Sequence, residues 1–157
     1  MWPTVVLIVL VVAAAVAGWV FAVPRIRAAR RRARVAGAVE TFAEQRLALE
    51  QAFFRCASAT GKPRGLRWKE CQFEPGVTFV QDRQSGDLAA LVAVTISFEA
   101  IEGGPMEEVE AVGNLRAATA MFTFANDGWL TEGRAFLNLD PEDAIGRFDG
   151  QVEVVPN

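Results

Sequence analysis

The sequence predicts an α+β protein, in which an N-terminal single transmembrane helix precedes an amphipathic helix packed on a four- to six-stranded antiparallel meander sheet. Three observations lead to this prediction. Residues 5–23 carry no charge, residues 38–59 repeat apolar side chains at helical spacing, and apolar and polar side chains alternate from residue 66 onward. The expected parts are a short tail at 1–4, the transmembrane helix at 5–23, an Arg-rich juxtamembrane collar at 24–37 and a soluble α+β domain at 38–157.

The uncharged segment has the length that a membrane helix needs. Its 19 residues would span roughly 28 Å as a helix, against a hydrocarbon layer of ~30 Å. Trp2 and Trp19 lie near its ends, where indole rings suit the headgroup region, and Pro24 marks its exit. A cleaved signal peptide is the alternative, but no Lys or Arg precedes Val5, and several arginines follow the segment. The pattern therefore favours an uncleaved anchor.

A cluster of basic residues follows the uncharged segment and predicts the topology. Because basic residues next to a membrane span favour the cytoplasmic side, we expect the N-terminus outside and the domain in the cytoplasm; an extracytoplasmic domain is the alternative. The same side chains are expected to contact the anionic headgroups of the lipid bilayer. Arg outnumbers Lys by 14 to two, which is typical of GC-rich bacterial coding. The cluster consists of Arg25, Arg27, Arg30, Arg31, Arg32 and Arg34.

The amphipathic helix is predicted over residues 38–59. Its apolar side chains recur at intervals of three, four and seven residues, which places them on one face. Gly37 is a candidate break before the helix, and Gly61 and Pro63 are expected to end it. The predicted buried face comprises Val39, Phe42, Leu49, Phe53 and Cys56.

A change to a period of two predicts the sheet. In the long strand at 88–101, Val92, Val94, Ile96 and Phe98 are expected on one face, and Ala93, Thr95, Ser97 and Glu99 on the other. Asp140 is a predicted N-cap of a short helix that extends to Phe148. The remaining predicted strands cover residues 66–73, 77–82, 114–125 and 129–139, with a last edge strand at 151–155.

The hairpin between residues 114 and 139 permits a prediction of register. A two-residue turn at Asp127-Gly128 would pair Asn126 with Trp129 and place Phe122 opposite Gly133. One face would then be a core face, and the other would mix polar and apolar residues. The core face would hold Ala118, Ala120, Phe122, Phe124, Trp129, Ala135, Leu137 and Leu139; the mixed face would hold Thr119, Met121, Thr123, Glu132, Arg134, Phe136 and Asn138.

A helix followed by a meander sheet resembles the NTF2-like and cystatin-like α+β folds. The resemblance is one of architecture, because the chain carries no motif of either family. It implies a curved sheet whose open face could bind a small molecule.

The predicted open sheet face supplies the candidate ligand site. Thr95 and Ser97 would lie there beside charged side chains, and a curled sheet would gather them in a shallow polar cup. A desolvated Glu99 or Glu132 could act as general acid or base, and Arg134 could bind a carboxylate. The alternative is a solvated outer face with cross-strand Glu–Arg pairs. The candidate ligand-binding residues are Glu99, Glu132, Arg134 and Asn138.

Composition excludes several other classes of site. The chain has no His and two Cys, so we predict no catalytic residues, no metal site and no cofactor. Cys56 and Cys71 are expected to be reduced core residues in the cytoplasm, or a disulfide if the domain lies outside. Ten basic against 19 acidic residues from Val35 onward argue against nucleic acid as a partner. The acidic connection at 102–113 is expected to be a solvated loop.

Two functional hypotheses remain. The first is a non-enzymatic, single-pass membrane-anchored interaction or scaffold domain that binds a protein partner or a second copy of itself. The second is a small-molecule-binding or enzymatic α+β domain that uses the polar sheet face. The first is preferred, because the chain has an anchor and lacks a catalytic constellation.

Overall fold

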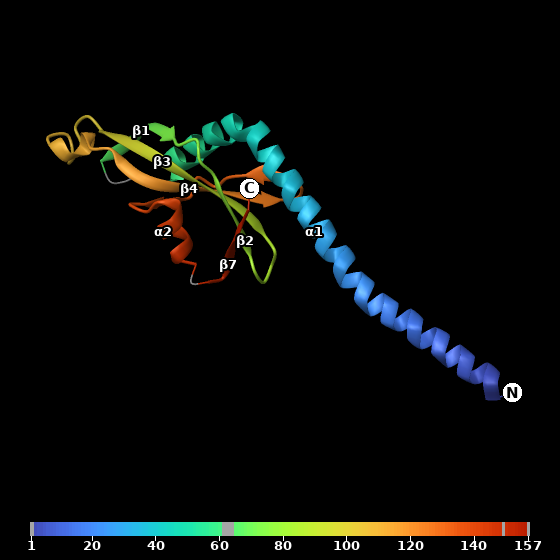
Figure 1. Cartoon of the computed structure of the whole chain (residues 1–157). Helices are drawn as coiled ribbons and strands as arrows, with labels where there is room; N and C mark the ends of the chain where they lie inside the picture. The colour runs from blue at the N-terminus through green and yellow to red at the C-terminus, as the bar shows by residue number, and fades with distance from the viewer. Residues whose placement is uncertain (1, 61–64, 149, 157) are drawn as a thin grey trace. The chain divides into compact units, whose positions relative to one another are not determined.

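The computed structural model describes residues 2–60, 65–148 and 150–156, and only the backbone at 3–6 and 8–15. It divides into two compact units, residues 1–37 and 38–157. The described elements are α1 (Trp2–Thr60), β1 (Leu66–Phe73), β2 (Thr78–Asp82), β3 (Leu88–Ala100), a 3-10 turn (Glu110–Gly113), β4 (Arg116–Ala125), β5 (Gly128–Leu130), β6 (Ala135–Leu137), α2 (Pro141–Gly146) and β7 (Val152–Val155) (Figure 1).

The first unit consists of the N-terminal part of α1. The helix continues through Pro24 and Gly37, so neither residue ends it as expected. Pro24 has no N–H to donate to the Val20 carbonyl one turn earlier. At the next position, the Arg25 guanidinium donates to the Phe21 carbonyl at 3.3 Å. All six arginines of the collar are exposed. Within the described residues, no helix combines the length and the apolar character of a membrane span.

The second unit begins with the remaining turns of α1, which pack one face on the sheet. Phe42, Leu49 and Phe53 are buried, as their spacing predicts. The predicted Val39 and Cys56 are half-buried, while Ala38 and Ala57 are buried in their place. The contact face is therefore rotated toward these two alanines, whose small side chains let the helix approach the strands closely.

Within the described residues the antiparallel sheet has seven strands, which is more than the four to six expected. The order is β5-β4-β3-β2-β7, with β1 also paired to β3 and β6 also paired to β4. β3 is 13 residues long, and one of its edges pairs with β2 along its first half and with β1 along its second half. β7 pairs with β2, so the predicted edge strand is present and the sheet is more than a simple meander.

The predicted strand at 129–139 is divided in two, because the turn lies one residue earlier than expected. Asn126 and Asp127 have positive φ angles of 51° and 58°, and Phe124 pairs with Trp129. β6 nevertheless pairs Ala120 with Ala135, which is the predicted register. The register of β4 with β5 differs by two residues from the register of β4 with β6. Because the difference is an even number, the side chains of the two short strands keep the same alternation between the faces of the sheet.

Aromatic rings fill the core between α1 and the sheet. The Phe42 ring lies 5.5 Å from that of Phe122 and 4.9 Å from that of Trp129, both in edge contacts. The Trp129 indole also donates to the Ala38 carbonyl at 2.7 Å, which joins β5 to the helix. The predicted inward face of β3, including Val92, is buried in this core as expected.

A second, smaller core lies on the opposite face of the sheet, where α2 covers part of the predicted mixed face (Figure 1). The Asp140 side chain accepts from the Asp143 N–H at 2.8 Å and caps this helix, as predicted. The buried centre comprises Val80, Leu91 and Ala144, with Ala89, Met121, Phe136, Leu139, Ile145 and Val152 packed around it. The mixed face is therefore only partly open to solvent.

Candidate functional site

The residues of the predicted polar cup are not brought together. Glu99 lies on β3 beside Arg67 of β1, and the Arg67 Nε is 2.5 Å from the Glu99 carboxylate. Both side chains are exposed, as in the alternative of cross-strand pairs on a solvated face. The nearby Ser97 Oγ is buried and has no hydrogen-bond partner among the described residues.

The other three candidate residues lie at a different part of the sheet. Arg134 and Glu132 are exposed, with 4.0 Å between their charged groups. Asn138 is also exposed and has a positive φ of 57°. The Arg134 carbonyl accepts from Met121, which pairs with Leu91, eight residues along β3 from Glu99. This separation corresponds to roughly 26 Å, so the four residues form no common site.

A cleft between the second half of α1 and β1 is the more favourable candidate. It has a volume of about 470 Å³ and is open to solvent. Its apolar lining includes Leu47, whose side chain is 69% exposed although it lies on the sheet-packing helix. An open cleft with an apolar lining and a few polar groups is the usual form of a binding site. The lining residues are Leu47, Glu50, Gln51, Phe54, Arg55, Lys69, Glu70, Cys71 and Phe73.

The charges in this cleft are unequally paired. The Glu50 carboxylate accepts from Arg46 at 2.8 Å, and the Glu70 carboxylate accepts from the Gln72 amide at 3.2 Å. Arg55 and Lys69 form no ion pair within the described part of the chain. The cleft therefore presents two cations without an ion pair among the described residues, while Glu50 is paired with Arg46 and Glu70 accepts a hydrogen bond from a neutral amide.

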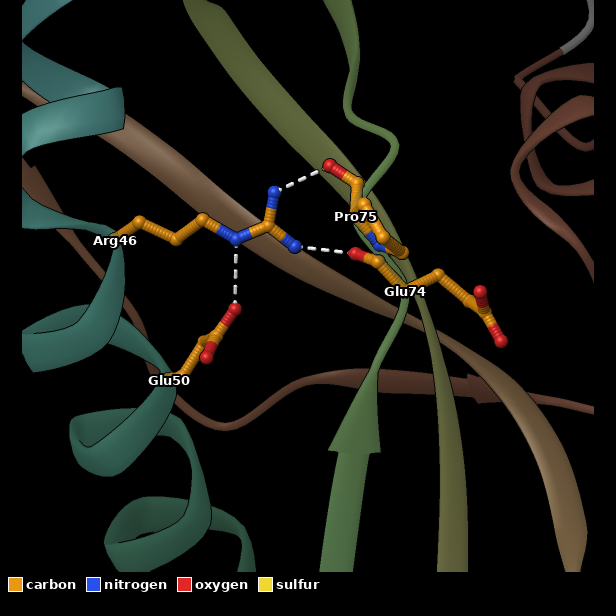
Figure 2. Close-up of polar contacts among 4 residues, drawn as sticks. All are labelled: Arg46, Glu50, Glu74 and Pro75. Carbon is orange, nitrogen blue, oxygen red and sulfur yellow. Dashed lines mark hydrogen bonds and ion pairs between the residues drawn. The ribbon is translucent and has the colours of Figure 1, made fainter.

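Arg46 holds the two walls of the cleft together, as Figure 2 shows. Its Nε donates to Glu50 on the same helix, and its Nη1 donates to the Pro75 carbonyl at 2.5 Å. Its Nη2 donates to the Glu74 carbonyl. One guanidinium thus fixes α1 against the turn that follows β1.

Cys71 forms part of the cleft wall but is unsuited to nucleophilic chemistry. Burial, with the adjacent Glu70 carboxylate as a smaller cause, raises the pKa of the thiol to about 12. The thiolate is the reactive form, so the group stays protonated at physiological pH. Cys56 and Cys71 are both free and half-buried.

A second cavity, of about 360 Å³, lies on the face of the sheet that α2 partly covers. Val80, Leu91, Met121 and Phe148 supply much of its apolar lining. Asp82 lies at this cavity, where the backbone N–H groups of Ser85 and Gln84 lower the pKa of its carboxyl. These bonds shape the turn between β2 and β3, which is a structural role.

The sequence does contain a signal for the cleft, which a count of charge along the whole domain obscures. Residues 51–69 contain five of the ten basic residues of the domain and no acidic residue. Arg55 and Lys69 belong to this stretch, which covers the end of α1 and the start of β1. A window of this length would have marked the region as basic within an acidic domain.

Comparisons of the chain with models of protein families, with curated proteins and with solved structures give no match. Among the described residues, no group of three or more Cys, Asp and Glu side chains is arranged to hold a metal ion. The functional argument therefore depends on the geometry of the cleft.

Proposed function

We propose that this protein is a membrane-anchored interaction domain, whose cleft between α1 and β1 binds a protein partner. The observation that carries the proposal is the cleft itself, with its exposed Leu47 and the available cations of Arg55 and Lys69. Aromatic, apolar and Arg side chains around an open groove are characteristic of protein interfaces.

The membrane part of the proposal is supported by the sequence of the first unit. An uncharged segment of 19 residues is followed by six exposed arginines on the same helix. Such a segment would act as a single-pass anchor, with the arginines at anionic headgroups and the domain on the cytoplasmic side. Confinement to a membrane raises the effective concentration of neighbouring proteins, so contacts of modest affinity would suffice.

Site-specific photocrosslinking in intact cells tests the interaction. A photoreactive amino acid is placed at Leu47 in the cleft or, as the control, at Leu137 on β6. Both positions carry exposed leucines, but β6 lies on the opposite side of β3 from β1. We expect one defined heterologous protein, identified by mass spectrometry, to crosslink to position 47 and not to position 137. Equal crosslinking at both positions, or none at position 47, would contradict the proposal.

The cavity beside α2 supports a second candidate function, the binding of a small apolar molecule. Its volume of about 360 Å³ lies within the range of small-molecule sites, and its lining is largely apolar. A panel of small apolar compounds should then raise the thermal unfolding temperature of the protein. Met121→Trp, which fills the cavity, should abolish this effect; a response that Met121→Trp leaves unchanged would exclude this site.

A further inference from the structure

The β1 edge beside the cleft has the geometry to accept another strand. Within the described part of the chain, β1 pairs only with β3. The Glu74 N–H donates to the Ala93 carbonyl at 2.9 Å, and the ladder continues with Gln72 opposite Thr95. Because hydrogen-bonded pairs alternate along an antiparallel ladder, the N–H and C=O groups of Cys71 and Phe73 point away from β3, at the edge of the sheet that borders the cleft.

The usable length of this edge is limited at one end. The register of β1 shifts between Trp68 and Glu70, which places Lys69 in a bulge. Bulges and Lys residues are common means by which edge strands avoid indiscriminate pairing. The regular edge is therefore the segment 70–73, long enough for a short extended peptide and too short for a broad sheet-to-sheet contact.

The charge of the cleft specifies what such a peptide should carry. Arg55 and Lys69 have no ion pair within the described residues, whereas Glu50 is paired with Arg46 and Glu70 accepts from the Gln72 amide. An acidic side chain on the incoming segment would meet two cations. An apolar side chain next to it could pack against the exposed Leu47.

We propose, as an extension of the function given above, that the partner presents an acidic, extended segment that adds as a strand to residues 70–73. Its backbone would bond to Cys71 and Phe73, an acidic side chain would pair with Arg55 and Lys69, and an apolar side chain would cover Leu47. Strand addition gives affinity through the main chain, and the side-chain contacts give specificity.

Two other occupants of the cleft are distinguished by charge density and by the tests. Nucleic acid is disfavoured, because from Glu70 onward the chain has four basic and 16 acidic residues and a polyphosphate carries far more negative charge than one acidic side chain. A second copy of the chain would appear as a crosslink at Leu47 that joins two copies.

The first test selects peptides without assuming a sequence. A random library of displayed ten-residue peptides is panned on the full chain in lipid nanodiscs, with empty nanodiscs as the counter-selection. We expect enriched peptides to have net negative charge and at least one apolar residue. Enrichment of neutral or basic peptides, or of none beyond the empty nanodiscs, would overturn the inference.

The second test measures the contribution of the two cations. The affinity of an enriched peptide is compared for the wild type, for Arg55→Glu/Lys69→Glu and for the control Arg116→Glu/Arg147→Glu, which changes the net charge equally at exposed positions outside the cleft. We expect the cleft variant to lose about tenfold or more in affinity and the control to lose far less. Equal losses would show a general charge effect and contradict a specific pairing. Thermal unfolding of each variant identifies any loss that comes from misfolding.

The third test examines strand addition directly. Methylation of single backbone amides along the enriched peptide should weaken binding at every second position, because only alternate N–H groups would face β1. A uniform effect, or none, would exclude strand addition. If a partner still crosslinks at position 47 while these three tests fail, the inference of an acidic added strand is overturned and the proposed interaction function is not. A crosslink at Leu47 that joins two copies of the chain would exclude a heterologous partner.

Discussion

At the residue scale, the Cys71 thiol lies in the wall of the cleft and is a poor nucleophile. Burial disfavours the thiolate of Cys71, and the neighbouring Glu70 carboxylate acts in the same direction. The pKa of the thiol rises from its ordinary value of 9.0 to about 12 in the folded protein.

This pKa shift predicts a loss of stability in alkaline solution. Above pH 9 the unfolded state gains stability by releasing the Cys71 proton, while the folded state keeps it until about pH 12. The contribution of Cys71 to the free energy of unfolding should therefore be intact below pH 9 and decline between pH 9 and 12. Denaturant unfolding across this range should show a steeper decline for the wild type than for Cys71→Ala; parallel curves would contradict the prediction.

Arg46 is the residue on which the shape of the cleft depends most directly. Its guanidinium joins Glu50 of α1 to the Glu74 and Pro75 carbonyls. Arg46→Ala should lower the free energy of unfolding by about 2 kcal/mol, since hydrogen bonds to charged groups contribute ~1.5–3 kcal/mol each and solvent replaces part of them. Arg55→Ala, on the same helix without these bonds, is the matched control in denaturant unfolding. Similar losses for both variants would show that the Arg46 contacts add nothing.

At the element scale, one glycine determines how closely α1 approaches the connection between β5 and β6. Gly133 has a φ of +73°, and a Cβ there would lie 2.3 Å from the Ala57 backbone nitrogen. Gly103 has the same φ, but a Cβ there would meet nothing within 4 Å. A comparison of substitutions at these two glycines therefore separates the cost of a positive φ from the cost of the contact with α1.

Gly133→Ala should therefore destabilise the protein more than Gly103→Ala. Both variants bear the strain of a positive φ, on the order of 1 kcal/mol. Gly133→Ala must also move the helix, which adds about 1–3 kcal/mol by analogy with overpacked cores. Thermal or denaturant unfolding of the two variants measures the difference, and equal stability would show that α1 can shift at no cost.

Local periodicity explains which elements could be predicted from sequence. β1 covers the predicted 66–73, and β3 begins at 88 and ends one residue before the predicted end, because alternation is a local property of a half-buried strand. The close approach of Gly133 to the Ala57 backbone joins residues far apart in the chain, and a period of about 3.6 or two residues cannot reveal such a contact.

The candidate site was less predictable for a related reason. A period of two assigns a residue to a strand face, but it does not fix distances along the strands. Glu99 and Arg134 lie far apart on the sheet. The cleft, by contrast, combines a helix with an edge strand, and only the basic composition of residues 51–69 indicated it in advance.

At the scale of the whole molecule, the proposed membrane anchor leads to a prediction of topology. The six arginines after the uncharged segment predict a cytoplasmic domain. In a Cys56→Ser/Cys71→Ser background, Glu108→Cys should react with a membrane-impermeant maleimide only after lysis, whereas Trp2→Cys should react in intact cells. The reverse pattern would place the domain outside and would redirect the search for partners to the cell envelope.

The aromatic core also gives the domain an internal optical reporter. The chain has no Tyr and four Trp, of which Trp68 and Trp129 belong to the domain and lie in ring contact with Phe98 and Phe42 respectively. Rigid edge-to-face rings around an indole generate near-ultraviolet circular dichroism, which disappears when the packing loosens. The docking of α1 on the sheet can therefore be followed without any label, and a Trp129→Phe variant would separate its signal from that of Trp68.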